Sequence, residues 1–224
     1  MMRSIRLFVL ALLIGSSAAA FEPDSDFGAW FSVNVQKRVT RTFSLNVNPQ
    51  VRFNRNLATV DQYMAELGGE FLITRNFRAT LNYRLTESNR LDYFSTRHRV
   101  FLDLSYKQKY GRVVIGLRER IQSQFKDVYS SDLGRYPAWY LRTRLSLKYD
   151  TDLSWKPYAS TEIFYRTRDL ENPGNSVDQY RYEVGIDYSI TQDQSLNVFY
   201  MFKRNPEDRV YNEYITGLGY SITF

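Results

Sequence analysis

The chain of 224 residues contains no cysteine and a single histidine. Without cysteine, disulfide bonds and thiolate metal sites are excluded, and one imidazole leaves no cluster that could hold a transition metal. No glycine-rich phosphate-binding loop is present. The mean hydropathy of -0.45 excludes a bundle of transmembrane helices. We therefore expect neither a metal nor a cofactor.

The one long apolar run lies at the N-terminus and is too short to cross a bilayer. Arg3 and Arg6 precede the apolar residues Leu7 to Ile14, and small residues follow up to Ala20. This order is typical of a secretory signal peptide. We expect residues 1–20 to be the signal, with cleavage after Ala20, and residues 21–224 to form one barrel domain. The mature chain then has 28 basic and 24 acidic residues, because Arg3 and Arg6 are lost. A net charge of +4 is too small to indicate a nucleic-acid partner.

The last eleven residues alternate strictly between two faces. One face carries Tyr214, Thr216, Leu218, Tyr220, Ile222 and Phe224. Successive side chains of a strand point to opposite faces, so a period of two predicts a strand with one apolar side. The apolar positions that end in the terminal aromatic residue resemble the C-terminal signal of outer-membrane barrels, which barrel-assembly machinery recognises. We assign this role to Leu218, Tyr220, Ile222 and Phe224.

Alternating runs bounded by turn residues recur along the mature chain, and no helical period stands out. We predict strands near residues 28–38, 41–53, 62–73, 77–86, 97–107, 112–124, 138–150, 154–168, 179–191, 195–203 and 212–224. The fold class is an all-β, antiparallel transmembrane β-barrel. Single-chain bacterial barrels normally have an even number of strands, and segment 28–38 alternates least cleanly. We therefore expect about twelve strands, with ten as the alternative. Either residues 21–29 return through the lumen or one short strand is unrecognised.

The connections between these segments come in two alternating sizes. Short ones lie at 74–76, 108–111, 151–153 and 192–194, and longer ones at 54–61, 87–96, 125–137, 169–178 and 204–211. Outer-membrane barrels have short periplasmic turns and longer extracellular loops. The pattern predicts that the last strand ends in the periplasm.

The two faces of the predicted strands differ sharply in charge. From residue 41 onward, and leaving aside Arg41 at a turn, the apolar face carries one ionisable residue, Glu119, and the other face about twenty. Aromatic residues mark both ends of the apolar face. Residues Phe53, Tyr63, Tyr83, Trp139, Tyr180 and Phe202 mark one end, and Tyr106, Tyr149, Trp155 and Phe224 the other. Two aromatic girdles are typical of a barrel in a bilayer. We expect a bacterial outer-membrane protein surrounded by outer-membrane lipids.

Several segments resemble one family of Gram-negative outer-membrane proteins. They are Gly28-Ala29-Trp30, Val51-Arg52-Phe53, Leu81-Asn82-Tyr83-Arg84, Arg97-His98-Arg99, Phe101-Leu102-Asp103-Leu104, the segment 141–149 and Gly217-Leu218-Gly219-Tyr220. The family is catalogued as domain of unknown function 2490, and the resemblance covers nearly the whole mature chain. It implies the barrel fold and brings no activity or catalytic residue with it.

Arginine is the strongest chemical feature of the predicted lumen. The residues singled out are Arg84, Arg118, Arg120, Arg142 and Arg144. Arginine forks bind carboxylates and phosphates at two points, so one interpretation is a cationic constriction that favours small anionic solutes. The other is a structural ladder. In that case Glu66, Glu70, Asp103, Glu162, Glu183 and Asp187 would pair with these arginines and fill a narrow barrel. We expect a narrow pore or ligand-binding barrel without catalysis, with a structural or surface-interaction barrel as an alternative.

The single histidine, His98, supports a further alternative. If Tyr106 pairs with Val113, His98 opposes Ile121 and lies diagonal to Glu119 and Ser123. A serine, a histidine and an acid together can generate a nucleophile. This arrangement would suit a lipid-modifying hydrolase at the outer rim. The non-catalytic interpretation is a His–Glu pair at the level of the lipid headgroups.

Overall fold

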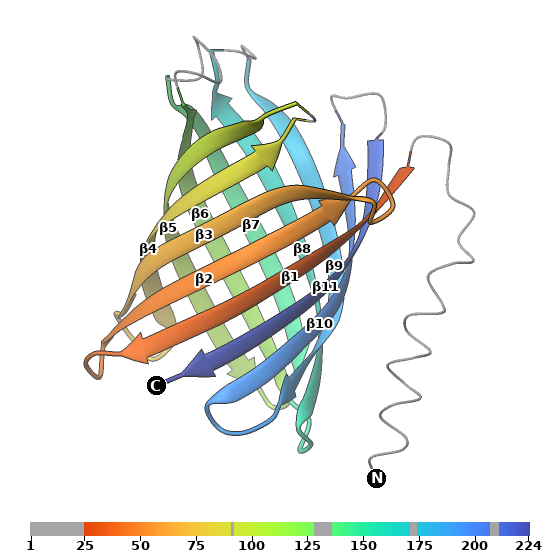
Figure 1. Cartoon of the computed structure of the whole chain (residues 1–224). Helices are drawn as coiled ribbons and strands as arrows, with labels where there is room; N and C mark the ends of the chain where they lie inside the picture. Colours follow the sequence, from red (N-terminus) through yellow and green to blue (C-terminus); the bar gives the residue numbers. More distant parts are fainter. Residues whose placement is uncertain (1–24, 91, 128–135, 171–173, 207–210) are drawn as a thin grey trace.

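The computed structural model describes residues 25–90, 92–127, 136–170, 174–206 and 211–224. The signal peptide that we expect at residues 1–20 lies outside these ranges. The described chain forms a single closed β-barrel (Figure 1). Among the described residues, no helix is both long and apolar enough to cross a membrane.

Over the described ranges the barrel has eleven strands, most of which are longer than the sequence pattern indicated. They are β1 (Ser25–Arg38), β2 (Phe43–Asn54), β3 (Thr59–Leu72), β4 (Phe77–Asn89), β5 (Phe94–Tyr110), β6 (Val113–Lys126), β7 (Ala138–Tyr149), β8 (Trp155–Arg168), β9 (Ser176–Ser189), β10 (Gln194–Asn205) and β11 (Tyr211–Thr223). Each strand pairs with its neighbours in the chain, and β1 with β11 closes the barrel.

The expectation of twelve strands, or ten, is wrong for a reason that lies in how the barrel closes. Strands β1 and β11 pair in parallel, with Trp30 opposite Gly217, and both arrows point to the same end in Figure 1. All other neighbouring strands are antiparallel, so an odd number makes the first and last strands run in the same direction. Within the described residues, closure therefore needs neither a twelfth strand nor a segment returning through the lumen.

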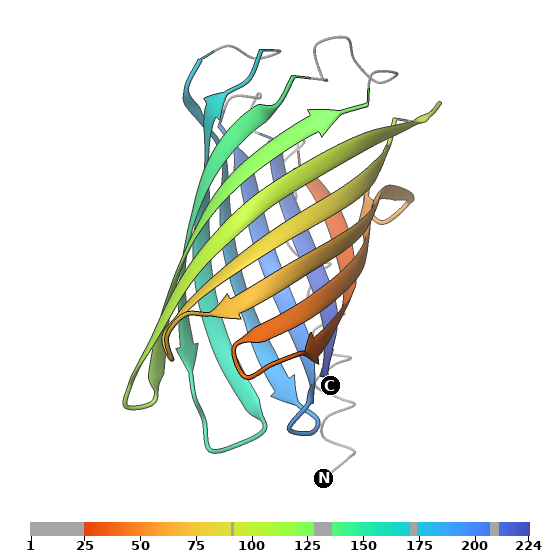
Figure 2. The ribbon, with the colours of Figure 1, turned by 90° about the vertical axis from the view of Figure 1, so that its left-hand side faces the viewer.

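The two ends of the barrel differ in their connections (Figure 2). At the end that we call the turn end, the links are short, and β5 and β6 are joined only by Gly111 and Arg112. At the opposite end, the loop end, the longest link spans residues 127–137. The predicted long connections 54–61 and 87–96 are wrong. Here β3 begins at Thr59 and β4 extends to Asn89, so half of the first segment and more than half of the second are strand.

The β2–β3 connection at the loop end has an unusual backbone. Arg55, Asn56 and Leu57 all have positive φ, at 52°, 54° and 69°, a region that costs non-glycine residues free energy. The carboxylate of Asp26 in β1 accepts hydrogen bonds of 2.9 Å from the amides of Arg55 and Asn56. Asp26 is buried. The first strand thus holds this turn in place.

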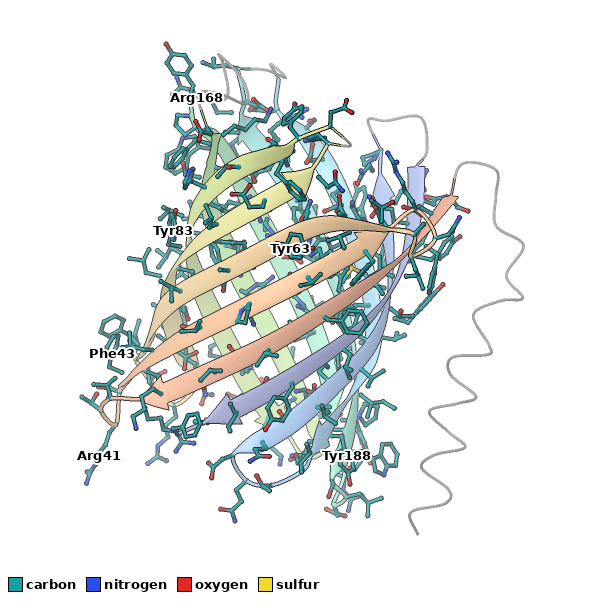
Figure 3. All side chains as sticks on the ribbon, in the orientation of Figure 1. Arg41, Phe43, Tyr63, Tyr83, Arg168 and Tyr188 are labelled. Atoms are coloured by element: carbon teal, nitrogen blue, oxygen red, sulfur yellow. The ribbon has the colours of Figure 1, made fainter. Side chains whose placement is uncertain are left out.

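The alternation predicted from the sequence holds around the barrel. The outer face carries exposed apolar and aromatic side chains, including Leu67, Leu81 and Leu145. Aromatic residues lie toward both ends of this face, and Figure 3 shows Tyr63 and Tyr83 nearer one end and Tyr188 nearer the other. The ionisable residues that share strand parity with Arg120 point into the lumen, where they pair with one another.

The core of the molecule lies inside the barrel. Trp30, Met201 and Ile215 form a buried cluster against which Phe199 packs. Glycine makes room for these rings, because a Cβ on Gly217 would lie 2.0 Å from the ring of Phe199. Large side chains inside the wall therefore depend on small residues on neighbouring strands.

Candidate functional site: the girdle of the lumen

The structure places all five predicted arginines on the inner wall. Arg118 lies directly opposite Arg144, and Arg120 opposite Arg142, across strands β6 and β7. Arg84 lies on β4. The ring of Phe101 on β5 lies between Arg84 and Arg120, with its centre 5.6 Å from the guanidinium carbon of Arg84 and 3.8 Å from that of Arg120. The sequence thus placed these residues on the correct face.

Each of these arginines has a carboxylate partner. Arg120 donates two hydrogen bonds to Asp103, of 2.5 and 2.6 Å. Glu162 accepts bonds from both Arg118, at 2.6 Å, and Arg142, at 2.8 Å. Charge-assisted bonds of this kind are stronger than neutral ones. The arginines are therefore bound by acids of the same wall.

The remaining two arginines complete the ladder. Arg144 donates to Glu183 at 2.8 Å, and the Nε of Arg84 donates to Glu66 at 2.8 Å. The other two acids considered for the ladder have different partners. Glu70 lies 3.5 Å from Arg78, and Asp187 pairs with Lys148. Four of the six proposed acids thus pair with the five arginines, and Glu162 is shared by two of them.

Aromatic rings lie between the arginines. The guanidinium carbon of Arg120 is 3.8 Å from the ring centre of Phe101, and that of Arg142 is 3.9 Å from Phe164. A cation over the face of an aromatic ring is attracted by the ring's charge distribution. Ion pairs and ring contacts therefore follow one another around the inner wall.

We call this set of residues the lumen girdle. It consists of Trp30, Glu66, Arg84, Phe101, Asp103, Arg120, Arg142, Glu162, Phe164, Met201 and Ile215. Its central members have almost no contact with water: Phe101 and Ile215 are 1% exposed and Arg142 is 4% exposed. Side chains that line an open aqueous channel would be wetted. The girdle instead resembles a packed interior.

Sequence reasoning overlooked the apolar members of the girdle. Trp30, Phe101, Phe164, Met201 and Ile215 occupy lumen positions by strand parity, but a lumen was expected to be polar. Trp30 explains why segment 28–38 alternates poorly, since Trp30 points inward and Phe31 outward. Large apolar residues at inward positions on separate strands were the signal that could have revealed a packed interior.

Three further lumen arginines lack a carboxylate partner within the described residues. Arg52 donates to Gln50 at 2.9 and 3.1 Å, and Arg99 donates to Gln124 at 2.5 and 3.1 Å. Arg181 donates to Gln179 at 3.1 Å. We call Arg52, Arg99 and Arg181 the glutamine-bonded arginines. They were not among the five predicted site residues.

The register predicted around His98 is wrong. Strands β5 and β6 continue to Tyr110 and Val113, so Tyr106 opposes Leu117 and His98 opposes Phe125. The two-residue turn shifts the pairing of β5 with β6 away from the expected pairing of Tyr106 with Val113. Ser123 is still diagonal to His98, but Glu119 is not. Two-residue hairpin connections are common in antiparallel sheets.

Different partners occupy the histidine and the acid of the hypothetical hydrolase. His98 Nδ1 lies 2.7 Å from the hydroxyl of Tyr83, and its ring stacks on Phe125 at 5.1 Å. Glu119 accepts a 2.9 Å hydrogen bond from Thr143. The outward acid is therefore a partner of Thr143, and the proposed His–Glu pair does not form.

A match to a family model shows which protein family this chain belongs to. The family model described as "Protein of unknown function (DUF2490)" matches residues 27–214. The chain belongs to the DUF2490 family. A comparison of this chain with curated proteins found no match.

Solved structures show the same fold in distant proteins. A "Bacterial polysaccharide outer membrane secretin" aligns with a TM-score of 0.52 and 10% identity, over 81% of this chain and 63% of that one. The "Beta Domain of the Bordetella Autotransporter Brka" aligns with a TM-score of 0.51 and 10% identity, over 79% of this chain and 82% of that one. At such identity the likeness extends to the fold alone. This DUF2490 barrel has the architecture of outer-membrane barrels.

At the turn end, one acid of this DUF2490 protein is strongly perturbed. Asp150 pairs with Lys109 and with Lys156. Hydrogen bonds from these two ammonium groups lower the pKa of Asp150 to about 2. Within the described part of the chain, no group of three or more His, Asp or Glu residues is placed to hold a metal ion.

Proposed function

We propose that this protein is a closed barrel of the bacterial outer membrane that binds small anionic solutes instead of conducting them. One observation carries the proposal: the lumen girdle is packed and nearly free of water contact, with Phe101, Met201 and Ile215 at most 3% exposed. Ions need a continuous hydrated path. The ladder interpretation of the arginines therefore fits this structure better than a constantly open pore.

The outer surface supports the membrane location. Exposed apolar side chains cover the outer face, and aromatic residues such as Trp139 and Trp155 lie toward opposite ends. Lipid tails favour such a band, and aromatic rings favour the two interfaces. In this proposal the turn end faces the periplasm, the loop end faces the exterior, and the surrounding partners are outer-membrane lipids.

Binding of anions is favoured by the positive charge of the glutamine-bonded arginines, which no acid of the described wall pairs with. Each of the five predicted arginines is paired with an acid, whereas the glutamine-bonded arginines are not. A lumen that is closed to flow but positively charged on one side suits capture of an anion better than passage. A catalytic role is not part of the proposal, because the register separates Glu119 from His98.

Single-channel recording in planar bilayers tests the closed lumen. We expect the refolded wild type to produce no conductance steps at moderate voltage. The double variant Trp30→Ala with Phe101→Ala should produce steps, because it removes two large rings from the girdle. The matched control is Trp139→Ala with Tyr106→Ala, which removes two exposed rings from the outer face and should stay silent.

The pore interpretation makes the opposite prediction. Steady conductance of the wild type with anion preference would overturn the proposal. Replacing Arg118, Arg120, Arg142 and Arg144 by Gln would then shift the reversal potential toward cations.

A further inference from the structure

The glutamine-bonded arginines converge inside the barrel although they come from strands far apart around the wall. Arg52 lies on β2, Arg99 on β5 and Arg181 on β9. Each of the three guanidinium groups nevertheless lies within electrostatic range of the other two. Strands this far apart bring side chains together only across the lumen. The three positive charges therefore face one shared space.

Aromatic contacts show where this space lies. Arg52 is 3.6 Å and Arg181 is 5.3 Å from the ring centre of Trp30, so both guanidinium groups rest on one indole. In the strand register each arginine lies opposite a member of the lumen girdle: Arg52 opposite Trp30, Arg99 opposite Arg84 and Arg181 opposite Glu162. Along β5, Arg99 lies one inward position nearer the loop end than Phe101. The shared space thus borders the lumen girdle at its loop-end edge.

No acid of the described wall neutralises these charges by direct contact. Glu162 lies opposite Arg181, but its carboxylate accepts bonds from Arg118 and Arg142. Glu213 pairs with Lys203. Asp61 interacts with Arg52 only over a longer distance, without an ion pair between them. The wall therefore leaves an excess of positive charge where three arginines meet.

The state of these residues is also consistent with a prepared site. Arg52, Arg99 and Arg181 are partly exposed, whereas the carboxylate-paired Arg120 and Arg142 are buried. Neutral glutamine amides hold the guanidinium groups without cancelling their charge. Like charges brought together away from bulk water repel one another, and a bound anion removes that cost.

We infer that Arg52, Arg99 and Arg181 form a binding site for a small anion with phosphate or carboxylate groups, entered from the loop end. This inference rests on the proposed function, because a closed girdle provides the floor of the site. Guanidinium forks match the planar carboxylate and the phosphate oxygens, and three of them favour a ligand with more than one negative charge. The ring of Trp30 lies against two of them and should report binding.

Fluorescence titration of the refolded full-length protein tests the site. In a Trp139→Phe and Trp155→Phe background, Trp30 is the only remaining tryptophan. Inorganic phosphate and succinate are added separately at constant ionic strength, which distinguishes the two ligand chemistries. We expect a saturable change with at least one of them, and a dissociation constant raised about tenfold or more by Arg52→Gln, Arg99→Gln or Arg181→Gln.

The control is Arg78→Gln, which also removes a lumen arginine but lies toward the turn end and is 44% exposed. It should leave the titration unchanged. Heat-modified electrophoretic mobility confirms that each variant is folded. An equal loss of affinity in the control would show diffuse charge attraction and overturn the site. Absence of a saturable response to both probes in a silent, folded barrel would also overturn it, whereas steady conductance would instead refute the closed lumen.

Discussion

At the scale of single residues, a side chain often decides a backbone far away in the sequence. Asp26 is separated from Arg55 by most of two strands, yet its carboxylate binds two amides of the β2–β3 turn. Backbone amides of successive residues form a concave site for an anion. Three successive non-glycine residues with positive φ are therefore held by an acid that local sequence does not connect to them.

We expect Asp26→Ala to destabilise the barrel by about 1–3 kcal/mol, because two charge-assisted bonds to the backbone are lost. The midpoint of urea unfolding in lipid vesicles measures the change. Asp152→Ala is the control, since Asp152 is 80% exposed and pairs with the exposed Arg112, and it should have little effect. Equal midpoints for the two variants would contradict the role of Asp26.

At the scale of strands, the length of a turn sets which residues of the two joined strands lie opposite each other. The β5–β6 turn contains two residues, and Gly111 adopts a φ of 58° that glycine tolerates. The sequence indicated the strands and their faces but not the length of this turn. Since each added turn residue changes the pairing of the whole hairpin, the predicted neighbourhood of His98 failed while its outward orientation held.

Strand β11 carries the proposed signal for assembly. Leu218 and Phe224 are exposed on the outer face, with Phe224 at 62%, and the Phe224 amide bonds the carbonyl of Gln36 in β1. Phe224→Ala keeps this backbone bond and removes only an exposed ring. This variant therefore distinguishes a role of the ring in recognition by assembly machinery from a role in the stability of the folded barrel.

We expect Phe224→Ala to lower the amount of heat-modifiable protein in the outer membrane several-fold, and to leave the urea midpoint of the refolded protein unchanged. Leu153→Ala, another exposed apolar residue near the turn end, serves as the control and should assemble normally. Normal assembly of Phe224→Ala would remove the proposed signal. A lowered urea midpoint would show that the ring acts in the folded barrel instead.

At the scale of the whole molecule, side chains of the lumen link strands that are not neighbours. Glu162 on β8 joins Arg118 of β6 as well as Arg142 of the adjacent β7. Arg181 of β9 contacts Trp30 of β1 as well as Phe164 of the adjacent β8. Such contacts act across the interior in addition to the hydrogen bonds between adjacent strands. They should make the barrel more cooperative than its ladder of backbone bonds alone.

We expect Glu162→Gln to cost about 3–5 kcal/mol, because two arginines lose a buried counter-charge. Glu70→Gln is the matched control, since Glu70 is 26% exposed and lies 3.5 Å from Arg78, and it should cost less than about 1 kcal/mol. Urea unfolding in vesicles measures both. Similar losses for the two variants would show that the girdle is not a special source of stability.

The sequence by itself determined the class of fold and the side of the wall on which each residue lies. A period of two is a local property, so alternation along each strand sorted Arg118, Arg120, Arg142 and Arg144 inward and Leu145 outward without knowledge of the rest of the chain. Only the tertiary structure decided the parallel closure of β1 on β11, the partner of each arginine and the place of Trp30 in the interior. These depend on strand register and on contacts across the lumen, which join residues distant in the chain. For the same reason, the number of charged residues in the sequence does not show which arginines lack a carboxylate partner. The closed barrel does.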